Sequence, residues 1–281
     1  MNYMSDTIDI SLMRERVETI EALPTVPATL KQISGMLEKP RLSIEELGRF
    51  IAGDPALTSK ILKMVNSAAY GFPNRISSIS HAIMLLGLNV VRGLLLGVSV
   101  FELMRRNIEG LWEHSLGCAV AARWIAQKKQ VKEPEEVSVC GLLHDIGKVI
   151  LILHFPEEYE KVQAKAGKEG ITLHEAERVF FDATHSDVGS WLARKWRFPV
   201  NLVEAIEYHH RPRLSKSAQL ETAIVHVSDA LVHAKGIGTA HDDLVPTINP
   251  DAWGLLQLSV NDIKAVLDEL EEAASSETEV W

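Results

Sequence analysis

The sequence predicts an all-α protein, and two observations support that expectation. Apolar residues recur at helical spacing in almost every periodic segment, and we find no convincing run of alternating apolar and polar residues with hairpin turns. Helix start and stop signals also recur along the chain. With 281 residues, the chain is long enough to bury one large core or two modest ones.

The start and stop signals place the helices in order. Capping signals occur at Ser43 with Glu46, at Asp54 with Pro55, and at Thr172 with Glu175. Turn-forming residues predict breaks at Gly71-Phe72-Pro73, at Gly87 and at Phe198-Pro199. A turn-rich loop from Gly236 to Pro250 separates a late helix from a final amphipathic helix that begins near Ser259.

The character of the chain changes near Arg105-Arg106-Asn107. Polar chemistry is sparse before this point, whereas histidines and carboxylates gather at helical positions after it. We therefore expect an N-terminal helical lobe over residues 1–107 and a metal-binding helical lobe over residues 108–281, with no Gly/Ser/Pro-rich linker between them.

Composition excludes several classes of function. The net charge is −9 and no block of Lys or Arg is present, so we do not expect a nucleic-acid partner. The two cysteines, Cys118 and Cys140, lie in separate apolar segments, which disfavours a disulfide framework or a zinc site built from cysteines.

Membrane insertion and export are not expected either. The most hydrophobic region, residues 82–104, is interrupted by Asn89, Arg92 and Glu102, and its unbroken runs fall short of the ~20 residues that span a bilayer. The N-terminus carries acidic residues where a secretory signal would carry basic ones. These features predict a cytoplasmic protein.

A His-Asp pair lies in the most apolar part of the second lobe. Nearly all neighbours of His144 and Asp145 from Val139 to Leu153 are apolar, so we expect a helix that is buried on most sides. An ionised Asp145 in such surroundings needs a positive partner. A metal ion and Lys148, one turn further along, are the two candidates, and this segment alone fits a metal-free His-Asp-Lys network equally well.

Further candidate ligands follow along the chain. Asp229 lies in another largely apolar helix and needs a cation or several donors. Taken singly, His114 fits a core histidine, His185 an exposed residue after the N-cap candidate Thr184, and the pair His209-His210 a helix end stabilised by the helix dipole. We interpret the remaining histidines as packing or surface residues, with His226 as the best exception: His81, His154, His174, His226, His233 and His241.

Taken together, these residues have the order that a two-metal site would need. The series His, His-Asp-x-x-Lys, His, His-His, Asp on successive helices supplies the shared ligands of a two-metal site. Imidazoles and carboxylates suit transition metals better than calcium or magnesium. We expect two divalent ions, with iron or manganese favoured over zinc or nickel.

The N-terminal part resembles the HDOD family. The matching text is Leu23-Pro24-Thr25-Val26-Pro27, Asp54-Pro55-Ala56-Leu57, Val65-Asn66-Ser67-Ala68-Ala69-Tyr70-Gly71, Ile79, Ala82-Ile83 and Leu86-Gly87. The resemblance spans roughly Leu23 to His233. It implies an HDOD fold and a regulatory role in bacterial signalling, as in relatives that have lost their metal ligands.

The histidine series resembles the HD phosphohydrolase superfamily, and is closest to the HD-GYP phosphodiesterases. That resemblance implies that Lys148 contacts substrate phosphate and that seven residues contact metal: His114, His144, Asp145, His185, His209, His210 and Asp229. The Gly-Tyr-Pro signature is absent, because Arg211-Pro212-Arg213 follows His210, so specificity for cyclic-di-GMP is not implied. No glutamate matching a third metal is evident one turn before His114.

Two functions follow from these observations. The first is a metal-dependent phosphohydrolase that cleaves a phosphodiester of a nucleotide or cyclic nucleotide, with Asp145 and Lys148 in catalytic roles and a nucleotide or cyclic dinucleotide as ligand. In this reading, Arg211 and Arg213 are candidates to hold a further phosphate. The second is a non-catalytic signalling module with a structural or sensory metal site and a signalling protein as partner.

Overall fold

The computed structural model describes residues 9–18, 28–67, 70, 72, 75–238, 242 and 244–276, and it confirms the all-α prediction. Within these ranges the regular elements are helices, and no β-strand occurs beyond a single bridge position at Phe181. The first helices are α1 (Ile10–Glu18), α2 (Ala28–Leu37), α3 (Ile44–Ala52), α4 (Pro55–Val65) and α5 (Ile79–Asn107). They are followed by α6 (Leu111–Lys128), α7 (Pro134–Leu143), α8 (Ile146–His154), α9 (Pro156–Glu169), α10 (Leu173–Phe180), α11 (His185–Lys195), α12 (Val200–Tyr208), the 3-10 turn η2 (Pro212–Leu214), α13 (Gln219–Lys235), α14 (Pro250–Leu256) and α15 (Val260–Ser276).

The predicted helix starts are confirmed. Ser43 caps α3 and Thr172 caps α10, each through a complete capping box with the glutamate three residues later. The carboxylate of Asp54 accepts hydrogen bonds from the backbone N–H groups of Ala56 and Leu57 at the start of α4. These signals appear in the structure because each satisfies backbone donors that a helix leaves free at its first turn.

Two of the three predicted breaks can be compared with the structure, and they differ in kind. Gly87 has φ +81° and ψ 167°, so it kinks α5 without ending it. Phe198-Pro199 separates α11 from α12 as predicted. Gly71 and Pro73 lie outside the described residues. The short helix α14 was not predicted: Asn249 caps it and Pro250 opens it, at the end of a segment that we assigned to a loop.

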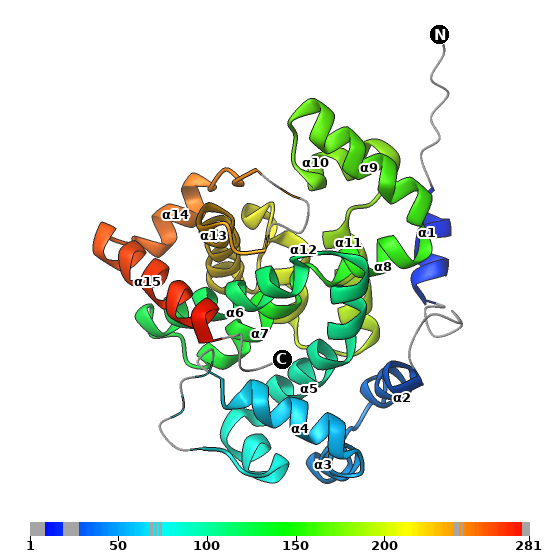
Figure 1. The fold of residues 1–281 in the computed structure, drawn as a ribbon, viewed down its shortest axis with the longest axis vertical. Helices are drawn as coiled ribbons and strands as arrows, with labels where there is room; N and C mark the ends of the chain where they lie inside the picture. Colours follow the sequence, from blue (N-terminus) through cyan, green and yellow to red (C-terminus); the bar gives the residue numbers. More distant parts are fainter. Residues whose placement is uncertain are drawn as a thin grey trace.

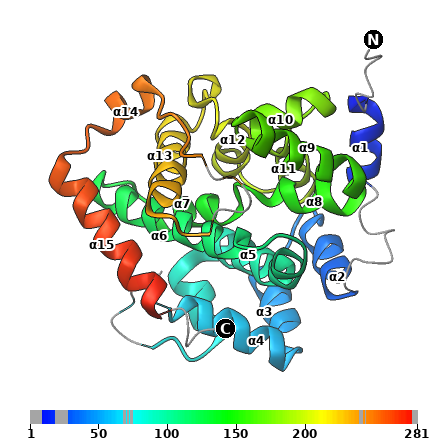
Figure 2. The same cartoon turned by 45° about the horizontal axis from the view of Figure 1, so that its top comes forward.

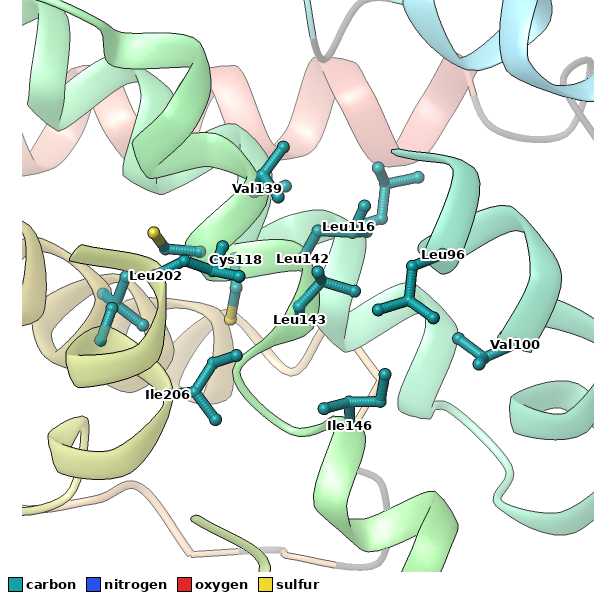
Figure 3. Close-up of a cluster of buried hydrophobic side chains, with 14 of the residues drawn as sticks. Leu96, Val100, Leu116, Cys118, Val139, Leu142, Leu143, Ile146, Leu202 and Ile206 are labelled. Carbon is teal, nitrogen blue, oxygen red and sulfur yellow. The ribbon is translucent and has the colours of Figure 1, made fainter. Parts of the chain in front are cut away.

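A central bundle holds the second half of the chain together. Helix α6 packs against α7, α13 and α15, while α12 packs against α7, α11 and α13. In Figures 1 and 2 helices α6, α7, α12 and α13 form the middle of the molecule, with α14 and α15 on one side and α9 and α10 on another. Figure 3 shows how α5 joins this bundle, because Leu96 and Val100 face Leu142, Leu143 and Ile146 across one apolar cluster.

The N-terminal helices are attached to this bundle at several points. Helices α2, α3 and α4 pack on α5, whereas α1 packs on α8 and α11 (Figure 1). The buried guanidinium of Arg92 donates from Nη2 to the carbonyl oxygens of Trp196 and Leu37, and the indole N–H of Trp196 donates to Ser34 Oγ at 2.6 Å. The division at residue 107 coincides with the end of α5, and as a division into lobes it stays a prediction.

Two apolar stretches, Ile79–Phe101 and Pro134–His154, have the length and hydropathy of membrane-spanning helices. An apolar window of 18 residues is 67% buried in the first stretch and 83% buried in the second. Both stretches therefore belong mainly to the interior of this fold, and their apolar composition matches that of core helices.

Close contact between α8 and α11 depends on Gly147. A Cβ atom built on Gly147 would lie 1.9 Å from the carbonyl oxygen of His185, a distance that real Cβ atoms do not tolerate. The absence of a side chain therefore allows α8 to approach the first residue of α11 closely.

Replacing Gly147 with Ala should destabilise the protein by about 1–3 kcal/mol, the usual effect of overpacking a tight contact. Gly167 is the matched control, because it is exposed on α9 and an added Cβ there meets nothing within 4 Å. Gly167→Ala should leave stability unchanged or raise it by up to about 1 kcal/mol. Denaturant unfolding of the two variants tests this, and equal stabilities would contradict the close contact.

Candidate metal centre

The predicted ligands come from five places in the bundle. His114 lies in the first turn of α6, and Asp229 lies in the middle of α13. His185 is the first residue of α11, after the N-cap Thr184. His209-His210 directly follows α12, and His144-Asp145 lies between α7 and α8.

The His-Asp pair does not lie within a continuous helix, contrary to the sequence prediction. Helix α7 ends at Leu143 and α8 begins at Ile146, with His144 and Asp145 in the turn between them. Asp145 leaves the helical region with φ −98° and ψ 10°. The unbroken apolar pattern hid this break, because both helices are buried and the side chains that force the turn are the polar pair itself.

The first cluster joins α6, α13 and the turn between α7 and α8. Nε2 of His114 lies 3.2 Å from Oδ1 of Asp229 and 3.4 Å from Nε2 of His144. Oδ2 of Asp145 lies 3.4 Å from Nε2 of His144 and 3.8 Å from Nε2 of His114. Two imidazoles and two carboxylates therefore point their ligand atoms at one small volume.

The second cluster gathers three histidines around the other oxygen of Asp145. Nε2 of His185 lies 3.3 Å from Nε2 of His209 and 3.0 Å from Nε2 of His210. Oδ1 of Asp145 lies 3.2 Å from Nε2 of His185 and 3.8 Å from Nε2 of His209. The Asp145 carboxylate thus lies between the two clusters, with one oxygen facing each.

Backbone carbonyl groups orient two of the imidazole rings. Nδ1 of His144 donates to the carbonyl oxygen of Gly141 and Nδ1 of His209 donates to that of Ile206, each at 2.7 Å. A neutral imidazole has a single N–H, so these two rings turn the bare lone pair of Nε2 towards the cluster. Such outer hydrogen bonds are what fix the orientation of metal-binding histidines.

Electrostatics keeps Asp145, Asp229 and His114 in the protonation states that metal binding needs. Burial raises the pKa of Asp145, but His144 and Lys148 outweigh it and hold the pKa well below its usual value. Burial also raises the pKa of Asp229, and His114 and His233 reverse that effect. Burial lowers the pKa of His114 to about 4. The two carboxylates are therefore charged, and His114 is neutral.

The residues present fit a metal centre. Asp145 Oδ1 and Asp229 Oδ2 make no hydrogen bond although both side chains are almost fully buried. Ligand atoms of these histidines and carboxylates form groups of three or four that lie within 4.8 Å of one another. A cation would meet the converging lone pairs and the unpaired carboxylate oxygens together, so this buried cluster could bind metal.

Lys148 contacts the same carboxylate. Its Nζ donates to Oδ2 of Asp145 at 2.7 Å, and the side chain is buried. Burial lowers the pKa of Lys148, but Asp145 and then Asp242 raise it above the ordinary value, so the ammonium group stays protonated and cannot bind a metal. Of the two partners that the sequence left open for Asp145, the structure shows Lys148 in contact with it, and the metal ion stays a prediction.

Glu177 is a functional candidate that the sequence analysis missed. It is fully buried in α10, and its Oε2 accepts hydrogen bonds from Nδ1 and from the backbone N–H of His185, both at 2.8 Å. Burial lowers the pKa of His185, but Glu177 and then Asp145 outweigh this effect, and the pKa rises to about 9. The helical spacing of the sequence could have indicated that Glu177 is buried, because Glu177 shares the apolar face of α10 with Leu173 and Phe180.

Two further histidines lie beside the ligands. Nδ1 of His233 lies 3.0 Å from Oδ1 of Asp229, and the ring centroid of His174 lies 4.3 Å from that of His210. The spacing of four residues from Asp229 to His233 could have indicated the first contact.

His226, our preferred exception, does not face the clusters. Its Nδ1 donates to the carbonyl oxygen of His209, and its Nε2 accepts from the backbone N–H of Asn249. It therefore supports the backbone around the His209-His210 turn.

The two arginines after His210 are engaged with acidic side chains. Nη2 of Arg211 lies 3.7 Å from Oδ1 of Asp187, and Nε of Arg213 lies 2.5 Å from Oδ2 of Asp251. These are ion pairs of partly or largely exposed groups, whose contribution to stability is small. Neither arginine is held towards the metal-ligand clusters by these contacts.

Replacing Glu177 with Gln should weaken metal binding by roughly 10–100-fold, the range for losing an outer partner of a metal-binding histidine. Glu160, exposed on α9, is the matched control, and Glu160→Gln should bind metal as the unaltered protein does. Competition with a chelator, carried to equilibrium, measures both affinities. Unchanged affinity in Glu177→Gln would show that Glu177 does not act through His185.

Comparison with known proteins shows which family this chain matches. The family model described as "HDOD domain" matches residues 23–212. A solved structure described as an HDOD domain protein with unknown function, from Geobacter sulfurreducens, is 27% identical, with a TM-score of 0.69 over 97% of this chain and 99% of that chain. An uncharacterized protein of Treponema pallidum is 27% identical over 197 residues, which are 69% of this chain and 38% of that protein.

Two further similarities are weaker, and the first of them concerns the fold alone. A "Putative phosphohydrolase" from Shewanella amazonensis SB2B has a TM-score of 0.65 at 18% identity, over 94% of this chain and 96% of that chain. Ribonuclease Y of Mycoplasmoides gallisepticum is 27% identical over 46% of this chain and 20% of that enzyme. This chain thus spans well under half the length of either curated relative. The family match covers more than half of the chain, and the protein belongs to the HDOD family.

Proposed function

We propose that this HDOD protein binds two transition-metal ions and hydrolyses a phosphodiester of a nucleotide or cyclic nucleotide. The observation that carries the proposal is the position of Asp145, whose two oxygens face two separate groups of imidazoles. A carboxylate shared between two ligand groups is what a binuclear centre requires. The two-ion count and the choice of iron or manganese over zinc or nickel belong to this proposal.

Each residue has a role in this reaction. His114, His144 and Asp229 would hold the first ion, His185, His209 and His210 the second, and Asp145 both. When bound, the ions supply a nucleophile from water at neutral pH and polarise the phosphoryl group. Lys148 lies 2.7 Å from Asp145, and its buried ammonium group would offset the charge that develops on the phosphoryl oxygens.

Access to the centre would come from the side of His210. The other six candidate ligands are between 0% and 2% exposed, whereas His210 is half-buried. The ring of His174 lies tilted against that of His210 at this edge, with the centroids 4.3 Å apart, so a substrate would meet His174 first.

The burial of the ligands also supports the second candidate, a signalling module without catalysis. Ligands sealed from solvent suit a structural or sensory ion, and the groups around Asp145 are sealed on every side but that of His210. In this alternative the protein acts through a signalling partner, and its metal stabilises the fold.

The purified protein should hold about two transition-metal ions per chain, as a binuclear ligand set implies. Asp145→Ala should lose at least one ion and about 3–5 kcal/mol of stability, because Lys148 would then be buried without its partner. Asp268, exposed on α15, is the control, and Asp268→Ala should keep both ions. Elemental analysis with thermal unfolding measures both effects, and negligible metal in the unaltered protein would refute the proposal.

Lys148→Met should keep its ions and lower kcat by roughly 10²–10³, the effect of removing one electrostatic donor to the transition state. Lys168→Met, on the exposed surface of α9, is the control and should keep full activity. Metal content, melting temperature and turnover are measured on the same samples with a panel of phosphodiesters and cyclic nucleotides.

The Lys148 experiment separates the two candidate functions. If Lys148 only neutralises Asp145, its loss lowers the melting temperature and there is no turnover to lose. A metal-replete protein that is inert towards the whole panel would rule out the hydrolase and leave the signalling module.

A further inference from the structure

The first ligand cluster contains a thiol that the histidine series does not include. Cys118 lies one helical turn after His114 on α6, so both side chains point to the same side of that helix. Its Sγ lies 3.5 Å from Nε2 of His114. One ligand atom from each of Cys118, His114, His144 and Asp229 lies within 4.8 Å of the other three.

The distances from His114 suit ligand atoms that share one ion. Metal bonds of ~2.0–2.1 Å to nitrogen and ~2.3 Å to sulfur place N and S ligands about 3.5 Å apart at a tetrahedral angle, and two N ligands about 3.3 Å apart. The structure has 3.5 Å between His114 Nε2 and Cys118 Sγ, and 3.4 Å between His114 Nε2 and His144 Nε2, while His144 Nε2 lies 3.9 Å from Asp229 Oδ1. The two distances from His114 are therefore those between ligands of one ion, and the third is longer.

A second observation points to a cation at this position. Oδ2 of Asp229 is buried without a hydrogen-bond partner, and Oδ1 of the same carboxylate lies 3.2 Å from His114 Nε2. A buried carboxylate oxygen without a donor is unfavourable, and a cation held by this group of ligands would satisfy it. The other cysteine, Cys140, is buried too, but it belongs to none of these ligand groups.

We propose that Cys118 binds metal as a thiolate in the first cluster, together with His114, His144 and Asp229. The inference rests on the metal centre of the proposed function. On binding, the S–H bond breaks, the proton passes to solvent and the sulfur lone pair forms the bond to the ion.

This ligand makes the two positions chemically unequal. The first combines a soft thiolate with imidazoles and carboxylate, whereas the second has three imidazoles and Asp145. Thiolate selects zinc or iron over manganese, so the first position would discriminate against manganese and the second would not. The competing interpretation is that Cys118 packs as a small apolar side chain, as its place in the cluster of Figure 3 also allows.

Cobalt(II) distinguishes these interpretations, because a thiolate bound to cobalt absorbs in the near ultraviolet by charge transfer and an imidazole or carboxylate does not. The full chain is produced in cobalt-supplemented, zinc-poor medium as the unaltered protein, Cys118→Ser, Cys118→Ala and the control Cys140→Ala. We expect the near-ultraviolet band in the unaltered protein and in Cys140→Ala, and its loss in both Cys118 variants. Elemental analysis should show cobalt in all four proteins, with less in the Cys118 variants.

Each other outcome is decisive. Bound cobalt without the band in the unaltered protein would overturn the thiolate ligand and leave the metal centre in place. A band that survives in both Cys118 variants would also overturn it. An unaltered protein that takes up no cobalt and no other transition metal would refute the thiolate and the proposed function together.

Discussion

The arrangement of the helices depends on how two charged carboxylates are kept inside an apolar core. Asp145 and Asp229 are 1% and 2% exposed, and their surroundings hold both in the ionised form. An isolated buried carboxylate costs far more than a domain's net stability, so it must be met by positive or hydrogen-bonding groups from several directions. Here those groups come from α6, α8, α11, α12 and α13, which fixes how these helices meet.

The same requirement explains details of the backbone. The chain turns at His144-Asp145 so that both side chains reach the clusters, and Gly147 then allows α8 to pass against the start of α11. The buried glutamate of α10 holds the imidazole of His185 from the opposite side. Polar groups thus specify one packing of an otherwise apolar bundle, although apolar packing provides most of its stability.

The sequence predicted most of the fold, because helical periodicity and capping signals are local properties. The all-α class, the caps at Ser43, Asp54 and Thr172, and the kink at Gly87 all follow from short segments. The resemblance to the HDOD family predicted the family itself, and the family match confirms it.

What the sequence could not supply was contact between distant segments. Glu177 appeared only as a polar residue on an apolar face, and its partner His185 follows eight residues later in another helix. The assignment of the histidines to a first and a second cluster also needed coordinates, since the order along the chain does not say which oxygen of Asp145 each imidazole faces. Cys118 is a different case, because its spacing of one helical turn from His114 is visible in the sequence, but the coordinates were needed to place its Sγ 3.5 Å from Nε2 of His114.

The near-complete enclosure of the ligands also affects how quickly an ion could come and go. Among the seven candidate ligands, which all lie in the described part of the chain, only His210 is partly exposed, so release of an ion from the first cluster would require the surrounding helices to separate locally. Exchange would then follow the rate of that opening and not the strength of the bonds. The metal bound by each molecule would then be determined while the chain folds, by the concentrations of the ions available in the cell at that time.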